Sequence, residues 1–127
     1  MKRINISSGS EYEKPIGFSR AVRIGNIISV AGTAPIAPDG TTAHPGDLYS
    51  QTKRCLEIMK KAITDAGGKL ENVIRTRIYL KDISDWKNAA KAHGEYFTAI
   101  RPACTFIEVK GLIKEDWLIE TEADCVI

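Results

Sequence analysis

The stretch Asp47–Lys81, DLYSQTKRCLEIMKKAITDAGGKLENVIRTRIYLK, decides the fold class, because the spacing of its apolar residues changes halfway along. Asp47 is a favourable N-cap, and Gly67-Gly68 can adopt the left-handed conformation that ends a helix. Between them, apolar residues recur at helical spacing, at Leu48, Cys55, Leu56, Met59, Ala62, Ile63 and Ala66. Asn72–Lys81 then alternates from residue to residue, which is typical of a strand. The stretch therefore predicts a helix followed by a strand.

The residues before this stretch predict three strands. We expect a short strand over Lys2–Ile6. Two β-prone segments, Ser19–Ile24 and Ile27–Gly32, are joined by Gly25-Asn26 and predict a tight hairpin, because glycine tolerates the positive φ of such turns. Thr33–Gly46 is rich in proline and glycine and is expected to be a loop.

The residues after this stretch predict a second helix and two final strands. Ser84 is expected to cap the helix, whose buried stripe would be Trp86, Ala90, His93 and Phe97. The strands cover roughly Ala103–Val109 and Trp117–Val126. The order β-β-β-α-β-α-β-β predicts an α+β fold, with one mixed sheet and two helices on one face, and residues 1–127 as a single domain.

The sheet face away from the helices is expected to be polar. Alternation places Ile74, Thr76, Ile78 and Leu80 on one side of their strand, and Val73, Arg75, Arg77 and Tyr79 on the other. The second set would share its face with Cys104, Phe106 and Glu108 and with Leu118, Glu120, Glu122 and Asp124. Two interpretations are open: a solvated face, as one-sided sheets often have, or a subunit interface with a polar cleft.

Composition excludes several classes of protein. The chain has 127 residues, of which 43% are hydrophobic, and a net charge of +2, as in a globular protein. It contains no apolar run of about 18 residues that would span a membrane, and no apolar stretch near the N-terminus that would suggest a secretory signal. The scattered lysines and arginines argue against nucleic-acid binding.

The cysteines suggest the compartment. Cys55, Cys104 and Cys125 are odd in number and lack metal-ligand spacing, so we expect no metal site. Free thiols are typical of a reducing compartment, which predicts a cytoplasmic protein.

Two C-terminal segments carry a resemblance to a known family. Arg101–Val109, RPACTFIEV, and Leu118–Ala123, LIETEA, resemble the signature of the RidA (YjgF) family, in which a Pro-Ala-Arg segment precedes an Ile-Glu-Ile-Glu-Ala strand. The segments Ile16-Gly17, Val30–Thr33 and Tyr79–Trp86 match as well. The resemblance implies a chorismate-mutase-like fold and a homotrimer whose sheets form a central barrel. It also implies clefts between subunits that bind small molecules, and hydrolysis of reactive enamines or imines without cofactor or metal.

The family's site residues carry over only in part. Glu120 matches the glutamate that is thought to position water and help move protons in the family. Cys104 falls where the family has the arginine that binds the substrate carboxylate as a bidentate fork. Ser19, Ala31 and Ala90 replace the usual tyrosine, serine and asparagine. The resemblance thus implies Glu120 as the catalytic residue and a changed substrate-binding wall, for which the candidates are Cys104, Ser19, Phe18, Thr105 and Phe106.

Each candidate also has a structural interpretation. Instead of acting in catalysis, Glu120 would form an ion pair with Arg75 or Arg77. The two arginines would either replace the missing arginine or, more simply, form in-sheet salt bridges with Glu108, Glu120 or Glu122. Cys104 would be a nucleophile or a pocket wall. His93 is expected to be a hydrogen-bonded core histidine rather than an acid–base group.

Three functions follow from the sequence. The first is a deaminase of altered specificity, and the second is a non-catalytic metabolite-binding or interaction protein on the same scaffold. A ribonuclease or translation inhibitor is disfavoured by the charge.

Overall fold

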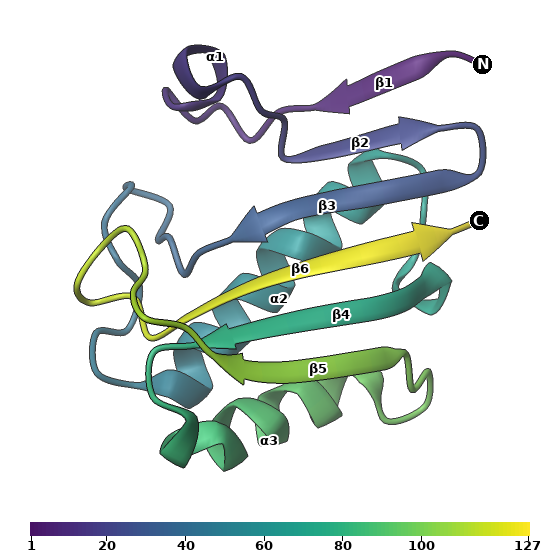
Figure 1. Ribbon diagram of the computed structural model, residues 1–127. Coiled ribbons are helices and arrows are strands. Elements are labelled where there is room, and N and C mark those ends of the chain that lie inside the picture. The colour runs from purple at the N-terminus through teal and green to yellow at the C-terminus, as the bar shows by residue number, and fades with distance from the viewer.

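Six strands form one mixed sheet in the computed structural model, which describes residues 1–127 (Figure 1). The sheet order is β1-β2-β3-β6-β4-β5, and every neighbouring pair is antiparallel except β4 and β5, which are parallel. The strands are β1 (Arg3–Ile6), β2 (Ala21–Ile24), β3 (Ile27–Thr33), β4 (Val73–Leu80), β5 (Ala103–Glu108) and β6 (Ile119–Val126). The α+β class and the strand order along the chain are as predicted.

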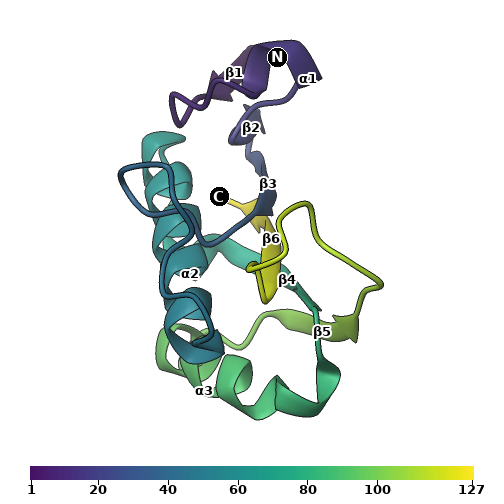
Figure 2. The ribbon, with the colours of Figure 1, turned by 90° about the vertical axis from the view of Figure 1, so that its left-hand side faces the viewer.

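Helices α2 (Leu48–Asp65) and α3 (Trp86–Phe97) cover one face of the sheet and leave the other open (Figures 1 and 2). A third helix, α1 (Glu13–Ile16), was not predicted and forms a single turn near β1. The Asp47 carboxylate caps α2 as expected, since it accepts a hydrogen bond from the Ser50 N–H. We call the covered side of the sheet the helix face and the other side the open face.

The start and the buried side of α3 differ from the prediction. The Asp82 carboxylate accepts hydrogen bonds from the Ser84 N–H and hydroxyl, so Ile83–Asp85 forms a separate 3-10 turn and α3 begins at Trp86. The buried residues of α3 are Ala89, Ala92 and Phe97. Trp86 is exposed, so the buried stripe is rotated from the expected one.

Strand β4 contains an irregularity that the alternation did not reveal. Its register against β6 shifts between Val73 and Arg75. Val73 is therefore buried in the core, and Ile74 is exposed, the reverse of the prediction. From Arg75 onward the strand alternates as expected, with Thr76, Ile78 and Leu80 buried. A β-bulge inserts one extra residue, so the alternation of side chains between the two faces shifts by one residue across it. Sequence alternation alone does not show where such a bulge lies.

The predicted side of Cys104, Phe106 and Glu108 is wrong. The parallel register pairs these residues with Thr76, Ile78 and Leu80, so all three lie on the helix face. Alternation groups the side chains of one strand, but only the register of β5 against β4 decides which group faces the helices. The other two groups meet as expected, since Tyr79, Arg77 and Arg75 pair with Glu120, Glu122 and Asp124 on the open face.

Candidate functional site

The charged groups at the centre of the open face are mostly paired with one another. Arg77 Nη1 lies 3.0 Å from Asp124 Oδ2 and 3.6 Å from Glu122 Oε1. The Tyr79 hydroxyl donates a hydrogen bond to Glu122. Arg77 thus forms the in-sheet salt bridges that were one of its two predicted roles, and it is not free to bind a ligand carboxylate.

Glu120 differs from these neighbours because no side chain pairs with it. It accepts no hydrogen bond, and no cation lies within salt-bridge distance, so the alternative ion pair with Arg75 or Arg77 is absent. Burial raises the pKa of the Glu120 carboxyl, the Arg20 charge lowers it, and the Glu122 charge raises it further. The net effect is a raised pKa, which is typical of carboxyls that transfer protons.

A glycine makes room for this carboxylate. The register of β3 against β6 shifts between Val30 and Thr33, so that Gly32 lies in a bulge. A Cβ on Gly32 would lie 2.9 Å from Glu120 Oε1. Any larger residue at position 32 would therefore displace the carboxylate.

Arg20 is a further candidate for the site that the sequence did not indicate. It directly precedes β2, and its Nη2 donates a hydrogen bond to the Gly32 carbonyl. Its Nε is buried without any hydrogen-bond partner. Burial lowers the pKa of the guanidinium, and the charges of Glu13 and Glu120 oppose this shift. The sequence around it, Ser19–Ile24, holds a second arginine, Arg23, so the pattern alone did not single out Arg20.

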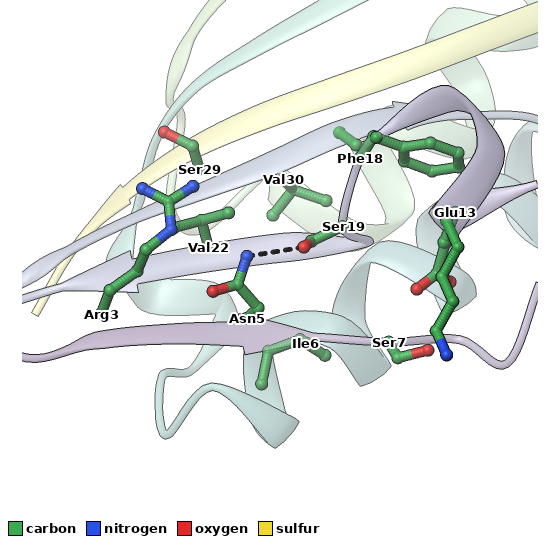
Figure 3. Close-up of a pocket in the computed structure, with 13 residues that line it drawn as sticks. Arg3, Asn5, Ile6, Ser7, Glu13, Phe18, Ser19, Val22, Ser29 and Val30 are labelled. Carbon is green, nitrogen blue, oxygen red and sulfur yellow. Dashed lines mark hydrogen bonds between the residues drawn. The ribbon is translucent and has the colours of Figure 1, made fainter.

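A hollow of about 650 Å³ on the open face of β1–β3 holds two of the predicted wall residues (Figure 3). Phe18 and Ser19 line it together with Glu13 from α1. Asn5 Nδ2 donates a hydrogen bond of 2.7 Å to the Ser19 hydroxyl. Ala31, which replaces the family's serine, also lines this hollow.

The other wall candidates lie away from Glu120 within one chain. Cys104 and Phe106 face α3, and Thr105 pairs with Arg77 on the open face. Cys104 Sγ is 3.8 Å from His93 Nε2, which also lies 2.9 Å from the Thr76 hydroxyl. Strand β4 separates β5 from β6. One chain therefore does not bring Cys104 and Glu120 into a single pocket.

His93 is the hydrogen-bonded core histidine that the sequence predicted. Its ring is half-buried, contacts Phe97 at a centroid distance of 4.7 Å, and is bonded to Thr76. Burial lowers the pKa of the imidazole, so the ring is neutral at physiological pH.

The fold holds no helix with the length and hydropathy required to cross a membrane. It also contains no group of three or more His, Cys, Asp or Glu side chains that could hold a metal ion.

Sequence relatives match most of the chain. The family described as Endoribonuclease L-PSP matches residues 11–127. A RutC family protein of Pyrococcus abyssi is 42% identical over 111 residues, which are 87% of each chain. The protein named 3-aminoacrylate deaminase RutC, from Acinetobacter baylyi, is 37% identical over 100 residues, or 79% of each chain.

Solved structures show the same fold. That of Rv2704 from Mycobacterium tuberculosis, described as a member of the YjgF/YER057c/UK114 family, has a TM-score of 0.89 and 41% identity, over 99% of this chain and 100% of that chain. The YjgF gene product of E. coli has a TM-score of 0.81 and 27% identity, over 96% and 93% of the two chains. Because motifs, sequence and fold agree over nearly the whole length, this chain belongs to the YjgF/RidA family.

Proposed function

We propose that the chain hydrolyses small enamines or imines without a cofactor, with Glu120 as the proton-transferring residue. The observation that carries the proposal is an unpaired, half-buried carboxyl with a raised pKa on the open face. The relative named 3-aminoacrylate deaminase, 37% identical to this chain, supports the reaction class. The three free cysteines support a reducing, cytoplasmic environment.

Glu120 would act twice in this reaction. Its carboxylate takes a proton from water while the water oxygen bonds to the carbon of the C=N group, and the Glu120 carboxyl then returns this proton to the nitrogen, which gives a carbinolamine. In the second step Glu120 accepts the hydroxyl proton and passes it to the amino nitrogen as the C–N bond breaks, so that ammonia leaves, a carbonyl product remains and Glu120 is again a carboxylate. A raised pKa suits this shuttle, because a carboxylate of higher pKa is a stronger base toward water and the hydroxyl, and a pKa closer to neutral lets the group both accept and return a proton.

We also propose that the site is completed by other copies of the chain, in a homotrimer. The open face carries the exposed apolar side chains Ile74 and Ile107 beside its charged groups, a combination that interfaces favour. A small-molecule cleft between subunits would then take Glu120 and Ser19 from one copy and Cys104 from another. In that arrangement Thr105 would line the cleft from the open face of β5, and Cys104 and Phe106, which face α3, would reach it only around the free edge of this edge strand.

The substrate range should differ from that of relatives with an arginine at position 104. Cys104 has no positive charge and cannot form a bidentate contact with a carboxylate. We therefore expect weak or no activity on 2-imino acids derived from serine or branched amino acids. The cysteine in place of an arginine at position 104 also favours the alternative function, that of a non-catalytic metabolite-binding protein. Ribonuclease activity is not proposed, because Arg77 is already paired with carboxylates and the net charge is only +2.

The test is to generate imines from a panel of amino acids with an amino-acid oxidase, in the presence of semicarbazide, and to follow ketoacid release. We expect acceleration of at least one imine, and its loss in Glu120→Ala with the oligomer retained in light scattering. If no imine is accelerated, the protein is a binding protein rather than an enzyme. Rates on serine-derived imines equal to those of an arginine-containing relative would contradict the altered specificity.

A further inference from the structure

We infer that Arg20 is an anion-binding residue of the open face and binds the carboxylate of a substrate next to Glu120. The nature of the substrate, an enamine or imine acid, rests on the proposed function. The anion site itself rests on the surroundings of Arg20.

The guanidinium of Arg20 uses few of its hydrogen bonds. It carries five N–H donors, yet its one acceptor is the Gly32 carbonyl. Its Nε is buried without a partner, and no carboxylate lies within 4.0 Å of the side chain. Buried donors in native proteins are nearly always satisfied, and a desolvated cation needs a counter-charge. The group is therefore arranged to receive an anion that the chain itself does not supply.

The neighbouring carboxylates do not fill this role. Glu13, the first residue of α1, is held by the preceding loop, because its Oε2 accepts hydrogen bonds from the N–H and the hydroxyl of Ser8. Glu120 lies near enough for its charge to affect the pKa of Arg20, but not within salt-bridge distance. Both carboxylates attract the cation without contacting it.

Two other arginines of the chain have more partners within the chain than Arg20 has. Arg23, on the β2 strand that follows Arg20, donates from Nε to the Gly25 carbonyl and from Nη1 to the Ala66 carbonyl at the end of α2. Arg77 is paired with Asp124. Arg20 has one backbone carbonyl where Arg23 has two, and it has no carboxylate partner.

The position of Arg20 suits a ligand of the proposed reaction. Gly32 contacts both groups, since its carbonyl accepts from Arg20 and its Cα faces the Glu120 carboxylate. Arg20 keeps part of its surface accessible to solvent. The planar fork of a guanidinium matches a carboxylate. A carboxylate on Arg20 would therefore place the rest of a small molecule beside Glu120, and Arg20 would take over the binding role that Cys104 lacks.

The test measures binding separately from catalysis. Pyruvate, a ketoacid of the product class, is titrated into the full-length protein at low ionic strength, with calorimetry or NMR shifts as the readout. We expect Arg20→Gln to weaken binding about 10- to 100-fold, the range that one charge-assisted contact commonly supplies. Arg20→Lys, which keeps the charge but loses the fork, should give an intermediate affinity. Arg23→Gln is the matched control and should bind pyruvate as the wild type does while its melting temperature falls.

Several outcomes would overturn the inference. One is wild-type protein that does not bind pyruvate, and another is Arg20→Gln that binds it unchanged. A third is loss of the oligomer in both Arg20 variants, which would mean that Arg20 pairs with a carboxylate of another copy. Glu120→Gln separates the two proposals: retained pyruvate binding without imine hydrolysis supports both, and retained hydrolysis contradicts only the role of Glu120.

Discussion

The helix face and the open face belong to the same strands, but they differ in whether their polar side chains have hydrogen-bond partners. Under the helices, Gln51 and the four buried threonines all have partners. Gln51 bonds to the backbone of Asp116 and Leu118, Thr33 to Ala31, Thr52 to Leu48, Thr76 to His93, and Thr121 to Met59 Sδ. On the open face, Glu120 has no partner and Arg20 lacks one for its Nε. These side chains of the helix face are satisfied within the chain, whereas we propose that a ligand or another subunit binds at the unpaired Glu120 and Arg20. Trp117 Nε1, just before β6, is the other buried group without a partner.

The largest expected effect tests this contrast on a single strand. Ile78 is fully buried on the helix face of β4, packed with Leu80 and Ile119, and Ile74 on the same strand is 54% exposed. Ile78→Ala should lower the free energy of unfolding by about 2–5 kcal/mol, because it leaves a cavity as well as removing apolar burial. Urea denaturation of the wild type and the variant, at one fixed protein concentration, measures this difference in the free energy of unfolding.

The matched control is Ile74→Ala, which should change stability by less than about 0.5 kcal/mol if the open face is solvated. An equal loss in both variants would show that another copy covers the open face at Ile74. That result would favour the interface interpretation of this face over the solvated one.

A smaller effect is expected from the polar network under the helices. Gln51 is fully buried, its Nε2 donates to the Asp116 carbonyl, and its Oε1 accepts from the Leu118 N–H. Gln51→Leu keeps the volume but leaves two backbone groups unsatisfied, so we expect a loss of about 1–3 kcal/mol. A melting temperature equal to that of the wild type would mean that water satisfies both groups, and that the helix face is less tightly closed than the structure shows.

Sequence patterns predicted the elements that depend on local spacing. The apolar stripe from Leu48 to Ala66 defined α2, and alternation defined β4 from Arg75 onward. The patterns failed where two strands must be aligned. The bulge at Val73–Arg75 and the parallel register that turns Cys104 toward α3 are properties of strand pairs, not of a single strand.

The candidate site residues came from the family resemblance more than from local pattern, and their role stays a prediction. Ser19 lines the hollow at β1–β3, and Glu120 lies on the open face of β6. Arg20 was missed, because its proposed role follows from the lack of a carboxylate partner around it in the fold. Sequence spacing does not indicate that a guanidinium will be buried without a carboxylate, since this depends on where Glu13 and Glu120 lie in the fold.

The smallest expected effect concerns Glu120 on the open face. Unlike the substitutions above, Glu120→Gln should gain stability relative to the wild type as the pH rises. The pKa of Glu120 is raised in the folded state above its unfolded value of about 4.3. The folded chain therefore binds more protons than the unfolded chain in the interval above pH 4.3, and the wild type loses stability as the pH rises through that interval.

Glu120→Gln cannot titrate, so its stability relative to the wild type should rise between pH 4 and pH 8, by less than about 1 kcal/mol given the solvent screening of a half-buried group. The measurement is a series of urea midpoints at several pH values, with Glu115→Gln as the control on an exposed side chain. A glutamine variant that is less stable than the wild type at pH 8 would show that the ionised carboxylate contributes to folding. Glu120 would then be a structural group of the sheet, and its lack of partners in one chain would be explained by a cation from another copy.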